Sequence, residues 1–404
     1  MTKKSILFWV LGMVCFMPNS FGQEENKKLE LTPYGFIKGE MIYASDGVYS
    51  WGNKANGYIS SPQFASGIET SALGFTAQHT RFGLKGSIGE EVKAGGVIEL
   101  DFYGGAFDAN VKPRIRQAYV SILKGGFEAR VGQQWDIFSP LNANTNNTNG
   151  NMWFAGNKGF RRPQFLLSYK IDHDMIAPMI QVSAGEAARE ETGLGKDNLS
   201  VSPMFQGRLS GKINKKYTVG LSFVNASFVE KKGTIENGTI LIDTLTSDLN
   251  VSTSGFCVDV TLPFHKYFNL HGEFNIGNNL NNANLFSAAG NYTWSIADDT
   301  KVVNVVDKSS TGFWFNAQSN VRDWLQVVIG YGMDNNTTSK LTVGAIESNS
   351  TIYGDLIFPI RHGFSVALEF QNIKTVEVTK LENDNAITTD FTANIINLAA
   401  KVNF

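Results

Sequence analysis

Charged residues in this chain of 404 residues are spaced so that many of them fall on one face of an extended segment. Arg81 and Lys85 alternate with Phe82 and Leu84, and Arg130 also lies between apolar neighbours. Side chains two residues apart share a face of a β-strand, so these residues form rows of charge. Rows of basic groups favour anions, and rows of carboxylates favour cations. The same spacing also produces ordinary solvated ion pairs, and the sequence leaves both interpretations open.

Most of the candidate charged residues alternate with apolar residues in this way. Arg114 and Arg116 share a parity with Ala118 and Val120, which leaves their direction undecided. Facing rows of opposite charge would create a transverse field, which a narrow passage with low-dielectric walls strengthens. The candidates for charge selection are Arg81, Lys85, Glu99, Asp101, Arg114, Arg116, Arg130, Asp136, Lys158, Arg161, Arg162 and Arg208.

Patterns typical of enzymes and metal sites are not recognisable in the sequence. The five histidines are scattered, and His265 and His271, which come nearest to ligand spacing, fall across an expected turn. There is no P-loop, dinucleotide fingerprint or Gly-x-Ser-x-Gly elbow. A net charge of −2 gives no basic excess of the kind that marks a nucleic-acid binder. We therefore expect no catalytic residue, no metal, no cofactor and no nucleic-acid partner.

The N-terminal residues have the pattern of an export signal. Two lysines precede an apolar run over 6–17, and the small residues Ser20 and Gly22 follow at positions −3 and −1 of the expected cleavage site. The run is shorter than the roughly 20 residues that a membrane-spanning helix needs. We expect 1–22 to be a cleaved signal peptide and 23–404 to be one mature domain. An uncleaved anchor is the alternative.

The two cysteines add little chemistry. Cys15 suggests a lipoprotein signal, but Val14 before it is not the small residue that such a site needs. Without the signal peptide, Cys257 is the single cysteine of the chain, so no intramolecular disulfide can form. It lies within an alternating segment, and we interpret it as a packing residue.

Period-two alternation is clearest at the C-terminal end. Ile396, Leu398, Val402 and Phe404 share one parity, whereas the other parity is mostly polar and includes Lys401. A transmembrane β-strand needs about 9–11 residues with one apolar face toward lipid. Strands of soluble sandwiches alternate too but are usually shorter.

The same alternation recurs along the whole chain, separated in turn by short and long polar connections. Short periplasmic turns and long outer loops are typical of outer-membrane barrels. The long connections are expected at 45–76, 186–201, 231–249, 278–309, 334–347 and 375–390. The sixteen expected strands cover 32–44, 77–88, 92–104, 113–123, 127–138, 163–172, 176–186, 202–213, 216–230, 251–262, 267–277, 310–318, 323–333, 348–359, 364–374 and 391–404. The sequence thus predicts an all-β fold, a transmembrane antiparallel β-barrel of sixteen strands with an aqueous lumen.

Three segments, 80–86, 113–120 and 129–138, resemble the DcaP-like porins and, more loosely, the trimeric general porins. The resemblance implies a homotrimer of barrels in outer-membrane lipid that passes small, often anionic, organic solutes. It also implies that a third loop, here 139–163, folds into the lumen, and that Phe404 is a signal for the barrel-assembly machinery. The chain departs from the family because 23–30 leaves no room for the coiled-coil segment that some members carry.

The third-loop segment contains three cations and no carboxylate, which favours a mild preference for anions if it lines the passage. A flexible surface loop is the alternative for this segment. For the whole chain we expect a diffusion channel in the outer membrane of a Gram-negative-type bacterium. An outer-membrane barrel hydrolase, or a non-conducting surface binding protein, remains the alternative. A soluble propeller is disfavoured because no repeat of roughly 40–50 residues is present.

Overall fold

The computed structural model describes residues 29–50, 62–104, 112–146, 152–187, 199–200, 202–230, 235–237, 240–242, 249–265, 267–291, 293–296, 303–383 and 385–404. The expected signal peptide lies outside these residues. Within the described ranges, no helix is long and apolar enough to cross a membrane.

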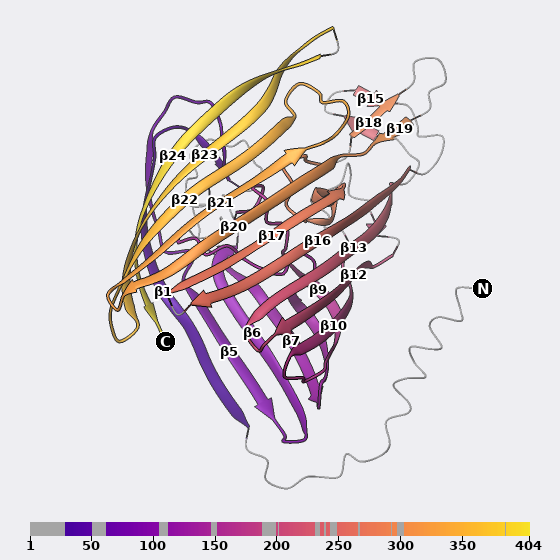
Figure 1. The fold of residues 1–404 in the computed structure, drawn as a ribbon. Helices are drawn as coiled ribbons and strands as arrows, with labels where there is room; N and C mark the ends of the chain where they lie inside the picture. Colours follow the sequence, from indigo (N-terminus) through magenta and orange to yellow (C-terminus); the bar gives the residue numbers. More distant parts are fainter. Residues whose placement is uncertain are drawn as a thin grey trace, which may run out of the picture.

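The described strands form a closed antiparallel barrel in which each strand pairs with the next along the chain and the last pairs with the first (Figure 1). Two of its sixteen members are interrupted, β4 with β5 and β11 with β12. The wall consists of β1 (Glu30–Ala44), β4 (Ala72–Thr76), β5 (Arg81–Ile88), β6 (Val92–Gly104), β7 (Lys112–Lys124), β8 (Phe127–Trp135), β9 (Arg161–Lys170), β10 (Ile176–Gly185), β11 (Leu199–Ser200), β12 (Met204–Ile213), β13 (Tyr217–Glu230), β16 (Leu249–His265), β17 (Phe268–Asn278), β20 (Ser309–Arg322), β21 (Leu325–Asn336), β22 (Ile346–Arg361), β23 (Phe364–Glu382) and β24 (Asn385–Asn403). The predicted fold class and the sixteen-strand count are confirmed.

The long connections contain short elements of their own. They are β2 (Val48–Ser50) with β3 (Pro62–Ala65), β14 (Ile235–Asn237) with β15 (Ile240–Ile242), β18 (Thr293–Ile296) with β19 (Val303–Val306), and the 3₁₀ turn η2 (Leu280–Ala283). The loop expected at 375–390 is wrong in extent. Strands β23 and β24 pair up to Glu382 and Asn385, because the polar side chains there alternate on a two-stranded hairpin.

Alternation separates an apolar outer face from the inner face of the wall. Phe256 and Leu221 point outward and are 61% and 52% exposed, whereas their neighbours Cys257 and Ser222 are each 1% exposed. An outward apolar belt of this kind is the lipid-facing surface of a transmembrane barrel. Phe404 belongs to it, since its ring lies 5.8 Å from that of Phe82 and its backbone pairs with Gly35.

The wall between β4 and β5 is broken at 77–80. There the Thr80 hydroxyl accepts a hydrogen bond from the backbone N–H of Lys38 (3.2 Å), which replaces a ladder bond. The break places His79 against the inward-facing ring of Phe36, 5.0 Å between centroids.

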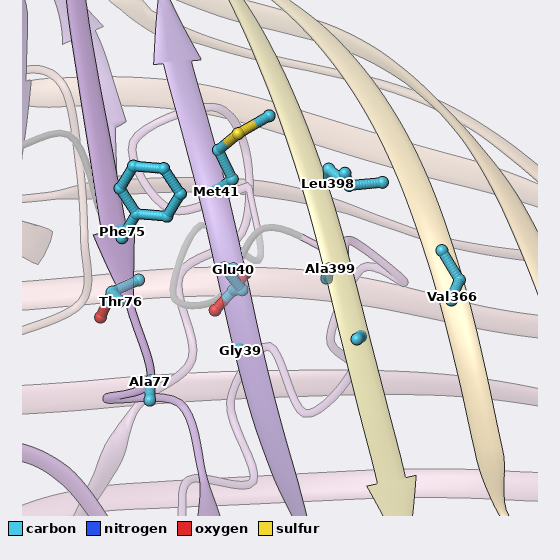
Figure 2. A pocket seen from close by; sticks show the side chains of 10 residues that line it. Gly39, Glu40, Met41, Phe75, Thr76, Ala77, Val366, Leu398 and Ala399 are labelled. Atoms are coloured by element: carbon cyan, nitrogen blue, oxygen red, sulfur yellow. The ribbon is translucent and has the colours of Figure 1, made fainter.

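On the outer face beside this break, an open hollow of about 720 Å³ extends across β4, β1, β24 and β23 (Figure 2). Phe75, Met41 and Leu398 stand around it (Figure 2), and the small residues Gly39 and Ala400 are also part of its lining. Its lining is mainly apolar, so the hollow is part of the lipid-facing belt.

A β-bulge in β7 determines where two of the candidate arginines point. Glu99 pairs with Gln117, but the next residue, Leu100, pairs with Ile115, so Arg116 is an extra residue in the ladder. A bulge re-aims the side chains on either side of it. Arg114 and Arg116 both face inward as a result, although the apolar residues that share their parity further along β7 face outward.

Candidate functional site

Residues 136–160 connect β8 to β9, so the loop expected at 139–163 ends earlier, and Arg161 and Arg162 belong to strand β9. The described residues of 139–160 lie against inward-facing side chains of the barrel; 147–151 are outside the described residues. At the start of this loop, the Ser139 hydroxyl and the Leu141 N–H donate hydrogen bonds to the two carboxylate oxygens of Glu273 (2.6 and 2.7 Å). Glu273 is buried on β17, whereas its neighbour Phe274 is exposed on the outer face. The loop is therefore attached to the inner wall.

The first half of the loop then follows the inner wall. The Asn144 N–H donates to the side chain of Asn316 on β20 (3.1 Å), and the Asn146 N–H donates to Glu369 on β23 (2.6 Å). On β1, the Lys38 ammonium donates to the Asn146 carbonyl. These hydrogen bonds hold residues 142–146 inside the barrel, against the inner faces of β20, β23 and β1.

The second half packs directly on the backbone of the wall. Asn275 donates a side-chain hydrogen bond to the carbonyl of Gly156 (2.6 Å), which has a left-handed φ of +103°. A Cβ on Gly332 of β21 would lie 2.1 Å from the carbonyl oxygen of Ala155. Glycine at these positions allows the close approach of loop and strand.

Five of the charged candidates form one network on β5, β6 and β7. Arg114 contacts Asp101 with two hydrogen bonds (3.0 and 2.7 Å), and Arg116 bridges Asp101 (2.9 Å) and Glu99 (2.8 Å). Arg81 lies 3.7 Å from Glu99. Charge-assisted bonds with this geometry hold guanidinium groups in fixed positions.

An opening of about 320 Å³ separates this network from residues 142–146 of the loop. Lys38, Arg81, Arg116 and Lys401 contribute to its lining, and none of its lining residues is a carboxylate. The loop side contributes mainly asparagine and threonine. A solute in this opening would therefore meet positive charge on the wall and neutral hydrogen-bonding groups on the loop.

Arg161 is buried beside this opening. Its guanidinium lies 4.6 Å from the ring centroid of Trp135 and 4.7 Å from that of Phe160, and its Nη1 has no hydrogen-bond partner. The Arg116 guanidinium also lies over Trp135, at 5.9 Å. Aromatic faces attract cations and so offset part of the repulsion between these two arginines.

The other candidates lie apart from the opening. Lys158 contacts Asp334 (2.5 Å) with both side chains fully buried. The pairs Arg162–Asp136 and Arg208–Asp259 (both 2.7 Å) are also buried. Arg130 pairs with Glu128 (2.8 Å), and Lys85 lies over the ring of Tyr34.

Sequence reasoning missed Lys38, His79 and Lys401 as residues of the opening. Lys38 and Lys401 are cross-strand partners on β1 and β24. Both alternate with apolar or small residues along their strands, and this alternation could have predicted that they face the lumen. His79 has no such signal, because it lies in the wall break. Its two ring nitrogens are 3.2 Å from Lys38 Nζ and 3.4 Å from Arg81 Nη2.

Among the residues that the structure describes, no group of three or more His, Cys, Asp or Glu side chains is arranged to hold a metal ion.

No family model matches the sequence. No curated protein matches it at a significant level.

Solved structures of outer-membrane proteins are similar over nearly the whole chain. The outer membrane channel DcaP of Acinetobacter baumannii is 18% identical, with a TM-score of 0.71 over 93% of this chain and 97% of that one. An anion-selective porin from Comamonas acidovorans is 13% identical, with a TM-score of 0.58 over 93% and 100%. The trimer form of OmpT, an outer membrane protein of Vibrio cholerae, is 12% identical, with a TM-score of 0.55 over 93% and 99%. This chain therefore has the β-barrel fold of these outer-membrane proteins.

Proposed function

We propose that this chain is an outer-membrane porin, a passive diffusion channel for small hydrophilic solutes with a mild preference for anionic organic compounds. The observation that carries the proposal is the opening between residues 142–146 and the basic wall, whose lining contains cations and no carboxylate. Low-dielectric walls and little screening make such a charge effective over the width of a narrow passage.

The balance of charge around the opening supports the preference for anions. Six cations gather around the opening: Lys38, Arg81, Arg114, Arg116, Arg161 and Lys401. The carboxylates that contact these cations or the loop side of the opening are four: Glu40, Glu99, Asp101 and Glu369. Lys38, Arg81, Arg116 and Lys401 line the opening, whereas the carboxylates are not among its lining residues. A solute thus meets the positive groups first.

We also propose that the chain is exported to the outer membrane and assembles there as a homotrimer. The outward apolar belt supports placement in the outer membrane, after removal of 1–22 as a signal peptide. A homotrimer is proposed because the sequence resembles trimeric porins and because one similar structure is a trimer form. The proposal assigns no enzymatic activity to the chain.

Liposome swelling tests the proposal. Vesicles that contain the folded protein are diluted into an organic anion, a neutral polyol or an organic cation of matched size. The proposal predicts swelling with all three solutes and fastest swelling with the anion. Absence of swelling with a verified, folded barrel would favour a surface binding protein or a barrel hydrolase, and fastest swelling with the cation would contradict the anion preference.

A further inference from the structure

The inner face of the barrel is apolar over one sector, which a water-filled lumen does not explain. Met204 of β12, Val224 and Ala226 of β13, and Val251 and Cys257 of β16 all face inward and are at most 2% exposed. Lumen-facing residues of a conducting barrel are normally polar, because water contacts them. This sector must therefore be covered by other parts of the chain.

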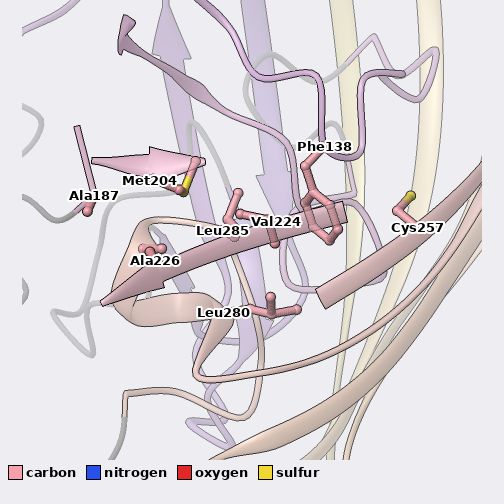
Figure 3. Packing of buried hydrophobic residues seen from close by; sticks show 9 residues of the cluster. Phe138, Ala187, Met204, Val224, Ala226, Cys257, Leu280 and Leu285 are labelled. Carbon is pink, nitrogen blue, oxygen red and sulfur yellow. The ribbon is translucent and has the colours of Figure 1, made fainter. Parts of the chain in front are cut away.

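The cover is a segment that the sequence predicts to be part of a polar surface loop. Leu280 and Leu285, from the connection after β17, pack with Phe138 against Val224 and Cys257 (Figure 3). Leu285 is 0% exposed, and the flanking Phe286 is 9% exposed. Residues 279–291 therefore fold into the barrel, and burial of their leucine and phenylalanine side chains stabilises that position.

Asn279 holds the base of this segment. It adopts a left-handed conformation with φ 50°, which asparagine tolerates better than most residues. Its side-chain amide donates to Ser252 O (2.9 Å) and its side-chain carbonyl accepts from Lys308 N–H (2.9 Å). The segment is thus joined to β16 and to the residue before β20.

The tip of the segment is attached to the third loop. The ring of Phe286 lies 4.5 Å from that of Trp153 and 5.0 Å from that of Phe160. The Ala288 N–H donates to Asp334 Oδ2 (2.6 Å), the same oxygen that accepts from Lys158. Residues 139–146, 152–160 and 279–291 consequently form one packed body, which we name the inner plug.

From this arrangement we infer that residues 279–291 are a second constriction element, which confines solutes to the basic side of the lumen and sets the upper size limit of the passage. The inference rests on the proposed channel function. Phe138, at the start of the third connection, covers part of the sector of β12, β13 and β16, and Leu280, Ala283 and Leu285 of 279–291 pack beside it on the same sector. Among the residues that the structure describes, the opening beside Lys38, Arg81, Arg116 and Lys401 lies on the side of the lumen that 279–291 does not cover.

The experiment uses Cys257 as a built-in probe, because it lies beneath the inner plug at 1% exposure. In a full chain with Cys15→Ser, Cys257 is the single thiol. A double variant, Leu285→Ser with Phe286→Ser, weakens the packing of 279–291 and leaves every residue of the barrel strands unchanged. Val343→Ser, at an exposed position in another connection, is the matched control. Heat-modifiable migration on gels verifies that each barrel is folded.

We expect a hydrophilic maleimide to label Cys257 at least about 100-fold more slowly in the folded parent than in urea, because labelling requires local opening. The double variant should be labelled about ten-fold faster than the parent. It should also show larger single-channel conductance and admit larger neutral sugars, with weaker ion selectivity, whereas Val343→Ser should match the parent.

Two results would overturn the inference while leaving the channel function in place. One is rapid labelling of Cys257 in a folded, conducting parent, and the other is unchanged labelling, conductance and size limit in the double variant. If the parent and the double variant are both folded and neither conducts, the proposed channel function is wrong, and the inference fails with it.

Discussion

Lys158 and Asp334 are 176 residues apart in the chain and form an ion pair of 2.5 Å in which both side chains are fully buried. The pair joins the third loop to β21, and Ala288 N–H binds the same carboxylate oxygen. Lys158 was a candidate for charge selection, but in this position it meets no water. Its contacts instead support a role in holding the inner plug against the wall.

Lys158→Met should therefore lower stability more than it changes ion selectivity. Loss of the ammonium leaves Asp334 buried without its partner, which typically costs about 3–5 kcal/mol. Urea unfolding in detergent measures the change. The double variant Lys158→Met with Asp334→Leu should recover much of the loss, whereas Lys170→Ala, which breaks an exposed pair with Asp172, should change little. Equal, small losses in all three variants would contradict the anchoring role.

Gly332→Ala should displace the third loop. The new Cβ would lie 2.1 Å from the Ala155 carbonyl oxygen, so the backbone of the loop or of β21 must shift. Overpacking of this kind costs about 1–3 kcal/mol, and the open channel should become noisier in single-channel records. Gly354→Ala is the control, because its nearest contact would be at 3.8 Å. A quiet, fully stable Gly332→Ala channel would show that the loop does not press on β21.

Neutralising individual cations should shift ion selectivity in a definite order. Arg116→Gln removes a positive charge and leaves Glu99 and Asp101 less compensated, so the anion-to-cation permeability ratio should fall by a factor of about 2–3. Lys401→Gln should have a smaller effect. Arg130→Gln should have the least, since Arg130 pairs with Glu128 outside the opening. Reversal potentials under a KCl gradient measure all three, and the reverse order would contradict the assigned opening.

Deletion of Phe404 should impair assembly in the outer membrane but not folding of the barrel in detergent. Its backbone closes the ladder to Gly35 through two hydrogen bonds of 3.1 Å, and its ring lies on the lipid face. If Phe404 is an assembly signal, its deletion should greatly reduce the barrel found in outer membranes while refolding into detergent persists. Phe364→Ala, which removes another outward aromatic, should assemble normally. Normal assembly without Phe404 would remove the proposed signal role.

The barrel could be predicted because period-two alternation is a local property. Each of the sixteen expected spans falls on a described strand, and the inward direction of Arg81, Glu99 and Asp101 follows from parity alone. Parity fails where the backbone departs from a regular ladder. The bulge at Arg116 and the break that places His79 inward depend on pairing with β6 and β1, which no local pattern records.

The inner plug could be predicted only in part. The third loop was expected in the lumen because of a family resemblance, but the contact between Lys158 and Asp334 depends on the closed barrel. Residues 279–291 resemble an ordinary polar loop, since five of them are asparagine. Burial of Leu280, Leu285 and Phe286 could not be predicted locally, because it depends on the apolar inward face of β12, β13 and β16, which only the closed barrel brings near them.

Single-channel recording of the unmodified protein in a planar bilayer, under a KCl gradient, shows whether the barrel conducts and which ions it prefers. We expect stable conductance steps, in groups of three if the protein is a trimer, and a reversal potential that shows anion preference. A reversal potential on the cation side would contradict the role assigned to the basic wall. Absence of conductance from a folded barrel would contradict the channel itself.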